Sequence, residues 1–342
     1  MAPSHKDSND AKQPRNIGVL SAGGHTGLAV CDLLTSDMFK KDVTSVTALC
    51  YGKHGQDDLK EMGCVVLDIT NADVDDLTAS ISGIDTMLVI PPAVSDKVKI
   101  VRTATKAMKQ SKQVTNVCLL SSAGADYANR DQQPHLREFI DLETAVMQPK
   151  SDPETEDTAH SPCIVRAGFY AENLLDYASQ VKGEAKLPLP IDEDHKFAPA
   201  SPDVLLGDVA LLLAKIITSK GPHGLSDQVR GQIITLTGPM LVSGPELAEA
   251  ASQAFNQTLS FESISDKEAK KVLNSVPNDE LDSSEKEYLM EYYSLVKQGK
   301  TNYVSTLAFE PVTGQPVTGL SEFFSDYEDD LKPKSKKRRT RK

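Results

Sequence analysis

Short apolar runs alternate with amphipathic segments through the first half of the chain. The runs are rich in Val, Ile and Leu, as buried strands are, and they cover residues 17–20, 43–50, 64–68, 86–90, 117–121 and 163–166. The segments between them place apolar residues at helical spacing, and they cover residues 28–34, 57–62, 71–80, 94–111 and 136–147. Strands that alternate with helices in this way predict a parallel α/β sheet with helices on both faces.

The second half of the chain has a different character. Residues 149–161 are polar, acidic and interrupted by proline, which predicts an exposed, flexible insertion. From Phe169 onward the pattern predicts helices and strands of a smaller lobe. These are amphipathic helices over 204–217 and 243–255, strands over 232–236 and 258–262, and acidic helical sequence to about residue 300. We expect this lobe to lie over the carboxyl ends of the strands, where ligands bind in such folds.

The chain divides into four expected parts. They are a disordered leader (1–15), an α/β sheet domain (16–168), a C-terminal lobe interleaved with the sheet (169–330) and a basic tail (331–342). The leader has no apolar core, so it does not predict a secretory signal. No apolar run reaches the roughly 18 residues of a membrane span.

A turn of small residues joins the first predicted strand to the first predicted helix. A helix that begins directly after such a turn directs unpaired N–H groups and its dipole toward an anion. Gly24 allows a pyrophosphate to approach the backbone, and Gly27 allows the helix to pack on the strand. Ser21 stands where the first glycine of the G-x-x-G-x-x-G spacing is usual. The predicted phosphate-binding turn comprises Ser21, Ala22, Gly23, Gly24, His25, Thr26 and Gly27.

Charge is unevenly distributed along the chain. The net charge is -12, yet the last eleven residues carry eight Lys or Arg and no acid. The rest is therefore strongly acidic, and direct nucleic-acid binding is not expected. The tail predicts a nuclear localisation signal or a solubilising run, so the expected location is cytoplasmic, nuclear or both. The five cysteines lie in or beside apolar runs without a C-x-x-C pair, which predicts buried, reduced thiols and no metal site.

Several separated segments resemble the NmrA-like family of atypical short-chain dehydrogenase/reductases. The most specific is IVRAGFYAENLL at 164–175, and the others cover residues 17–27, 66–70, 119–125, 207–210, 234–248 and 313–324. The resemblance implies a Rossmann-type, doubly wound sheet that binds NADP or NAD, with a smaller α/β C-terminal lobe closing a substrate cleft. Some members reduce quinones or small carbonyl compounds. Others are redox sensors that bind the cofactor and regulate transcription factors.

NADP is favoured over NAD by the end of the second predicted strand. An enzyme that prefers NAD usually carries an acid there, but the residues from Tyr51 to Gln56 include none, and Lys53 would attract a 2′-phosphate. A solvated turn lysine is the alternative interpretation of Lys53. The resemblance adds Tyr51 to the cofactor site, at a position where many members carry Arg, and places Asp68 and Ile69 beside the adenine, although Asp68 at a strand end also suits a helix cap. It also implies roles near the nicotinamide and its ribose for Pro91, Pro92, Tyr170, Ala171, Glu172 and Asn173.

Ordinary short-chain dehydrogenase/reductases use a catalytic Tyr-x-x-x-Lys pair. This pair is missing from the helix after the fifth predicted strand. The lysine that NmrA-like proteins commonly place four residues before Glu143 is replaced by Phe139. The only Tyr-x-x-x-Lys in the sequence, Tyr293 to Lys297, is interpreted as coincidence. Ser121 and Tyr127 are weak candidates for a catalytic role at the end of the fifth strand, with Ser122 beside them.

Two functions follow from these features. The first is an NADP(H)-dependent oxidoreductase that acts on a small carbonyl or quinone-type substrate. The second is a non-catalytic NADP(H) redox sensor whose partner is a protein such as a transcription factor. Hydride transfer can proceed without a protein acid if water supplies the proton, so the missing pair does not exclude the first.

Overall fold

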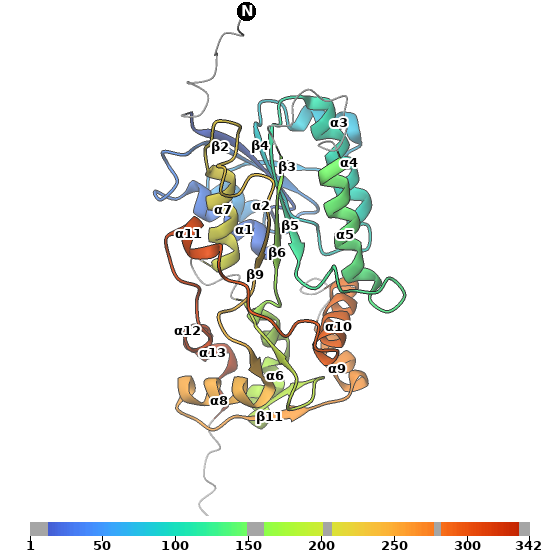
Figure 1. Cartoon of the computed structure of the whole chain (residues 1–342), viewed down its shortest axis with the longest axis vertical. Coiled ribbons are helices and arrows are strands. Elements are labelled where there is room, and N and C mark those ends of the chain that lie inside the picture. The colour runs from blue at the N-terminus through green and yellow to red at the C-terminus, as the bar shows by residue number, and fades with distance from the viewer. Residues whose placement is uncertain (1–12, 149–160, 201–206, 277–281, 335–342) are drawn as a thin grey trace, which may run out of the picture.

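A seven-stranded parallel sheet lies at the centre of the computed structural model, which describes residues 13–148, 161–200, 207–276 and 282–334 (Figure 1). Neighbouring strands pair in parallel in the order β3-β2-β1-β4-β5-β6-β9. The strands are β1 (Arg15–Leu20), β2 (Val43–Cys50), β3 (Val65–Asp68), β4 (Thr86–Val89), β5 (Asn116–Ser122), β6 (Cys163–Ala167) and β9 (Ile233–Leu236). This order confirms the Rossmann-type, doubly wound sheet expected from the sequence.

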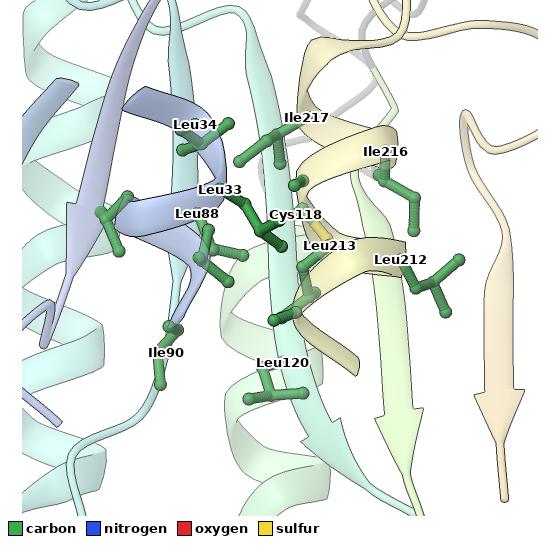
Figure 2. Close-up of a cluster of buried hydrophobic side chains, with 14 of the residues drawn as sticks. Leu33, Leu34, Leu88, Ile90, Cys118, Leu120, Leu212, Leu213, Ile216 and Ile217 are labelled. Carbon is green, nitrogen blue, oxygen red and sulfur yellow. The ribbon is translucent and has the colours of Figure 1, made fainter. Parts of the chain in front are cut away.

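Helices cover both faces of the sheet. One face carries α1 (His25–Thr35), α2 (Gln56–Glu61), α7 (Asp208–Thr218) and α11 (Phe309–Thr313), and the other carries α3 (Val74–Ser80), α4 (Lys97–Ser111) and α5 (Pro134–Met147) (Figure 1). Figure 2 shows the core of the first face, where Leu33 of α1 and Leu213 of α7 pack on Leu88 of β4 and Cys118 of β5. All five cysteines are buried and free, as the sequence predicts.

After β1 the chain continues toward the β3 edge of the sheet, and after β4 it continues toward the β9 edge. β2 and β3 extend it on the side of β1, and β5 and β6 extend it on the side of β4. At such a switch point the connecting loops diverge and leave a crevice outside the carboxyl ends of the strands. The glycine turn 21–27 follows β1, and Pro91 and Pro92 follow β4. The topology therefore brings two of the predicted cofactor segments to one edge of the sheet.

The helix α7 is buried on nearly all sides, whereas the sequence predicts an amphipathic helix there. Every residue of α7 except Lys215 is buried, because the helix packs on the sheet and also contacts α1 and α11. The Lys215 ammonium group lies 5.1 Å from the centroid of the Phe39 ring. A helix with partners on several sides needs no polar face. Residues 204–206, where the predicted helix would start, lie outside the described residues.

Asp208, the first residue of α7, makes the stability of the fold depend on pH. It is 2% exposed and accepts hydrogen bonds from Thr318 N (2.9 Å) and Oγ1 (3.0 Å). Burial raises the pKa of Asp208 to about 6, although the bonds from Thr318 oppose the rise. The folded protein therefore binds this proton more tightly than the unfolded chain, whose Asp pKa is about 3.9. The free energy of unfolding should fall as pH rises from about 4 to about 6.

We expect Asp208→Asn to remove that pH dependence. Asparagine can keep both contacts with Thr318 and carries no charge, so the variant should be about 2 kcal/mol more stable than the parent at pH 7.5. At pH 4 Asp208 is protonated in the folded protein and about half protonated in the unfolded chain, so the two proteins should differ by less than about 0.5 kcal/mol. Urea unfolding at the two pH values measures both differences, and an equal gain at pH 4 and pH 7.5 would contradict the assignment.

The C-terminal lobe lies below the sheet in Figure 1 and has its own core. Its strands are β7 (Lys186–Leu189), β8 (Lys196–Phe197), β10 (Val242–Ser243) and β11 (Ser260–Ser263), paired as β7 with β11 and β8 with β10. Its helices are η3 (Ala171–Tyr177), α6 (Ala178–Glu184), α8 (Gly244–Phe255), α9 (Asp266–Leu273), α10 (Ser283–Lys297), α12 (Leu320–Asp326) and α13 (Glu328–Leu331). Between β8 and β10 the chain returns to the sheet to form α7 and β9.

The first strand begins one residue earlier than the expected start of the sheet domain at residue 16. β1 begins at Arg15, whose guanidinium donates to the carbonyl oxygens of Ser219 (2.9 Å) and Gly224 (2.8 Å). Arg15 therefore belongs to the sheet and not to a leader.

The predicted insertion and most of the basic tail lie outside the described residues. Within the part of the chain that the structure describes, no helix is both long and apolar enough to cross a bilayer.

Candidate functional site

The glycine turn has the backbone geometry of a phosphate-binding turn. Ser21 has φ 59°, a left-handed conformation that glycine adopts without strain, which explains why glycine is usual at this position. A Cβ on Gly27 would lie 2.6 Å from the carbonyl oxygen of Ala22, so only glycine allows α1 to pack this closely. A Cβ on Gly24 would meet only the Ser21 carbonyl oxygen, at 3.7 Å. Gly24 is exposed, so a ligand can approach its backbone.

Polar groups at this turn are left for a ligand to satisfy. α1 begins at His25, and its N-cap, Gly24, makes no side-chain cap. The first N–H groups of a helix have no partner inside the helix, and the dipole favours an anion there. The buried hydroxyl of Ser21 also has no hydrogen-bond partner. Together these donors fit the twin phosphates of a dinucleotide.

The loop after β2 folds directly against the turn. His54 Nδ1 lies 2.7 Å from the carbonyl oxygen of Gly23. Because a carbonyl oxygen only accepts, Nδ1 carries the hydrogen and Nε2 is left for another partner. The rings of His25 and His54 are 6.3 Å apart, and Lys53 is exposed between Gly52 and His54. Lys53 and two histidines thus border the glycine turn on the side of β2.

Asp68 and Ile69 lie next to this loop at the end of β3. Thr70 donates to Asp68 from its N (2.9 Å) and its Oγ1 (2.6 Å), and Gly52 N donates to Thr70 Oγ1 (2.8 Å). The hydrogen bonds from Thr70 hold the pKa of Asp68 below its usual range, and Lys53 acts in the same direction. Ile69 is buried, and its N–H donates to the Cys50 carbonyl oxygen at 2.9 Å. The structure therefore places Lys53, Asp68 and Ile69 near one another at the ends of β2 and β3.

The segment after β6 reaches back to the same turn. Burial raises the pKa of Tyr170, and the nearby Thr26 side chain acts in the opposite direction. Ala171 N donates to the Ala200 carbonyl oxygen (2.8 Å), and Asn173 N donates to the Tyr170 carbonyl oxygen (3.0 Å), within the first turn of η3. Glu172 lies in that first turn as well, which is the position expected of a helix N-terminal acid.

A tyrosine from the lobe also enters this region, and the sequence analysis does not single it out. Tyr288 of α10 places its hydroxyl 2.8 Å from Ser122 Oγ, at the end of β5. Its ring centroid lies 5.8 Å from that of Phe139 on α5. Ser122 Oγ also donates to the Ala123 carbonyl oxygen at 3.2 Å. No local signal marks Tyr288, because its partner is 166 positions away in the sequence.

Ser121, one of the two weak catalytic candidates, belongs to a buried ionic network. Its hydroxyl donates to Glu143 Oε1 at 2.6 Å. Arg166 donates to both carboxylate oxygens of Glu143, from Nε (2.8 Å) and from one terminal nitrogen (2.7 Å), and its other terminal nitrogen pairs with Asp126 at 3.1 Å. Glu143 is 6% exposed. These bonds join β5, α5 and β6, so the hydroxyl of Ser121 is engaged in holding the fold.

Tyr127 and Tyr293 lie in different surroundings from Ser121. Tyr127 is 52% exposed and lines a cavity of about 250 Å³ together with Arg166 and Tyr303. Tyr293 is 1% exposed in the core of the lobe, and Lys297 pairs with Asp266. The Tyr-x-x-x-Lys spacing in α10 is therefore coincidence, as the sequence analysis expects.

The sheet order and the turn place this chain in the class of Rossmann-fold proteins. More specifically, the chain belongs to the NmrA-like family, whose model matches residues 13–331. The family assignment agrees with the resemblance carried by the separated sequence segments. It covers the sheet, the turn and the lobe together.

Known relatives include both reductases and a regulator. The NAD(P)H azoreductase of Xenophilus azovorans is 22% identical over 250 residues, which are 72% of this chain and 77% of that protein. The NADPH-dependent quinone oxidoreductase QOR2 of Escherichia coli, complexed with NADPH, is 19% identical with a TM-score of 0.69, covering 90% of this chain and 98% of that chain. The negative transcriptional regulator NmrA, in complex with NADP, is 14% identical with a TM-score of 0.69, covering 92% and 95%. At these identities the structural likeness establishes the fold.

Proposed function

We propose that the protein binds NADP(H) on the glycine turn and reduces a small carbonyl or quinone-type substrate. The observation that carries the proposal is the open backbone of Gly24 beside the unsatisfied hydroxyl of Ser21, at the N-terminus of α1. A dinucleotide pyrophosphate satisfies both features at once. The bound cofactor supplies the hydride.

Each part of the dinucleotide has candidate contacts. The turn 21–27 holds the pyrophosphate. Lys53 attracts the 2′-phosphate, with Tyr51, His25 and His54 nearby, and Asp68 and Ile69 border the adenine. Pro91 and Pro92 lie beside the nicotinamide ribose, where their missing N–H groups leave only shape and carbonyl contacts. The segment from Tyr170 through Ala171 and Glu172 to Asn173 flanks the nicotinamide.

Lys53→Glu tests the preference for NADP over NAD. A carboxylate at this exposed position should repel the 2′-phosphate, and we expect the dissociation constant for NADPH to rise by about tenfold or more. NADH has no 2′-phosphate, so its dissociation constant should change little. Calorimetric titration of both cofactors measures the two effects, and Lys60→Glu, which changes an exposed lysine on α2, is the matched control. An equal loss for NADPH and NADH would count against the assignment of Lys53.

The proposed activity is tested by NADPH consumption with a panel of neutral quinones, aldehydes and ketones. Calorimetry with NADPH comes first, because failure to bind either nicotinamide dinucleotide contradicts every function proposed for this site. Binding followed by oxidation of NADPH with at least one compound is the expected result. Binding without oxidation across the panel would favour the second function.

The second function is a non-catalytic redox sensor that reports the NADPH to NADP ratio to a protein partner. Phe139 at the usual lysine position and the absence of a Tyr-Lys pair on α5 favour it. The basic tail suits entry into the nucleus. In this case NADPH and NADP should differ in their effect on partner binding, and deletion of residues 332–342 should reduce the nuclear share of the protein in cells. An unchanged distribution would exclude the tail as a nuclear signal.

A further inference from the structure

We propose that Tyr288 is the proton donor of the reaction, supplied by the lobe in place of the tyrosine missing from α5. The inference rests on the proposed function. It starts from the contact of 2.8 Å between the hydroxyls of Tyr288 and Ser122. Ser122 ends β5, which lies beside β4 on the side of the switch point opposite β1.

Contacts on two sides fix the position of the Tyr288 side chain. The ring lies against Phe139 on α5, which is the position of the usual lysine. Tyr288 adds to the raised pKa of Tyr170 and Thr26 of the glycine turn opposes it, so both residues lie near Tyr170. The Tyr288 hydroxyl lies at the end of β5, and the carboxyl ends of parallel strands meet at the edge of the sheet that also carries the turn. A dinucleotide whose phosphates rest on that turn extends its nicotinamide in this direction.

Three other side chains of this region, those of Ser121, Phe139 and Lys97, are already engaged or have no proton to give. Ser121 donates to the buried carboxylate of Glu143, and Phe139 is apolar. Lys97 is 5% exposed, but its ammonium group pairs with Glu138 at 3.0 Å and donates to the His135 carbonyl oxygen. Tyr288 is only partly buried, so a substrate can reach it.

The surroundings keep the Tyr288 hydroxyl protonated. Burial raises the pKa of Tyr288, the hydrogen bond with Ser122 opposes the rise, and the carboxylates of Glu285 and Glu291 add to it. Ser122 Oγ donates to the Ala123 carbonyl oxygen, so Tyr288 is the donor in the bond between the two hydroxyls. In the absence of substrate, the neutral Tyr288 hydroxyl donates its hydrogen bond to Ser122 Oγ. When substrate binds, the same hydroxyl can donate to the substrate oxygen instead.

The step balances with the cofactor of the proposed function. Tyr288 gives its proton to the carbonyl oxygen while the hydride supplied by NADPH forms a C–H bond at the carbonyl carbon. The electron pair of the C=O π bond becomes the new O–H bond, and the O–H bond of Tyr288 breaks. The substrate gains two electrons and NADPH loses them. Water then returns a proton to the Tyr288 phenolate.

The same surroundings restrict the class of substrate. The rings of Phe139 and Tyr292, whose centroids lie 5.8 and 6.4 Å from that of Tyr288, suit a flat aromatic compound. The carboxylates of Glu285 and Glu291 repel an anion. We therefore infer a neutral aromatic aldehyde, ketone or quinone. A negatively charged analogue such as 4-carboxybenzaldehyde should react more slowly than 4-nitrobenzaldehyde.

Kinetics of Tyr288→Phe test the donor. We expect the rate of NADPH oxidation by 4-nitrobenzaldehyde to fall about a hundredfold, and the solvent deuterium isotope effect of the parent to disappear. The dissociation constant for NADPH, measured by fluorescence, should stay within about twofold. Tyr327→Phe, a partly buried tyrosine of the lobe, should match the parent. An unchanged rate, or an equal loss of NADPH binding, would overturn the proposal.

A second readout does not depend on turnover. In protein labelled with [13Cζ]tyrosine and saturated with NADP, the signal missing from Tyr288→Phe should shift when benzophenone is added, because the phenol changes its acceptor from Ser122 to the ketone. The Tyr327 signal should not shift. Absence of a Tyr288 shift while the protein holds NADP would refute the proposal. Failure of the parent to bind NADP at all would instead refute the proposed function.

Discussion

Replacing Gly24 by alanine should leave the fold intact and weaken NADPH binding by more than about tenfold. The backbone of Gly24 has φ -79° and ψ 165°, a conformation open to any residue. The added Cβ would meet only the Ser21 carbonyl oxygen at 3.7 Å, an ordinary contact. The free energy of unfolding should therefore change by less than about 1 kcal/mol. The Cβ would, however, stand where the pyrophosphate must approach the backbone.

Gly27→Ala, three residues further along the same turn, is the matched comparison. Its Cβ would lie 2.6 Å from the Ala22 carbonyl oxygen and 2.7 Å from the Ser21 carbonyl oxygen. Backbone atoms cannot move aside as a flexible side chain can, so α1 must shift away from the turn. We expect a loss of about 3 kcal/mol or more of stability, together with loss of NADPH binding.

Comparing Gly24→Ala with Gly27→Ala distinguishes a glycine needed for ligand contact from a glycine needed for helix packing. Urea unfolding without cofactor measures the stability of each variant, and calorimetry at a temperature where both are folded measures NADPH binding. Full binding by Gly24→Ala would show that no phosphate lies on this turn. Equal destabilisation by the two substitutions would mean that Gly24 is also a packing residue.

Local features explain how much of this site could be predicted from the sequence. The strand, the turn and the helix of residues 15–35 are contiguous, and each is defined by residue types within a few positions. The apolar runs of β4 and β5, and the last three residues of β2, are buried on both faces of a parallel sheet, so their pattern is strong. The contact of His54 with Gly23 follows from the topology, because adjacent parallel strands deliver their loops to the same edge.

Features that depend on how the lobe packs could not be predicted in this way. Tyr288 reaches Ser122 only because α10 lies against α5, and nothing near either residue encodes that contact. The burial of α7 depends on α11, which follows it by about 90 positions. The strands β8 and β10 have two residues each, too few to form a period-2 pattern. Ser121 and Ser122 illustrate the same difficulty, because adjacent strand residues point to opposite faces and the sequence does not say which face holds the ligand.

Glu143→Ala should destabilise the protein by about 3–5 kcal/mol, the cost of breaking a buried ion pair. The side chains of Glu143 and Arg166 are 8% and 15% exposed, so water does not replace the lost partner. The substitution leaves Arg166 with Asp126 alone and removes the acceptor of Ser121. The hydrogen bonds that Arg166 donates to Glu143 raise the pKa of Arg166, and Arg166 stays charged in either protein.

Asp141→Ala provides a control on the same helix. Asp141 also accepts two hydrogen bonds from an arginine, Arg130, at 2.9 and 3.0 Å. The Arg130 side chain is 62% exposed, and a solvent-exposed pair contributes about 1 kcal/mol or less. The two carboxylates therefore make similar contacts and differ mainly in burial.

The comparison decides whether Glu143 holds the fold or takes part in chemistry. If its role is structural, Glu143→Ala unfolds at much lower urea than Asp141→Ala, while the NADPH affinity of the folded fraction stays near that of the parent. The double variant Glu143→Leu/Arg166→Met should recover part of the loss, because it leaves no unpaired buried charge. A Glu143→Ala protein as stable as Asp141→Ala, but slow in hydride transfer, would instead assign Glu143 to the reaction. That result would also make Ser121, whose hydroxyl donates to Glu143, a catalytic candidate again.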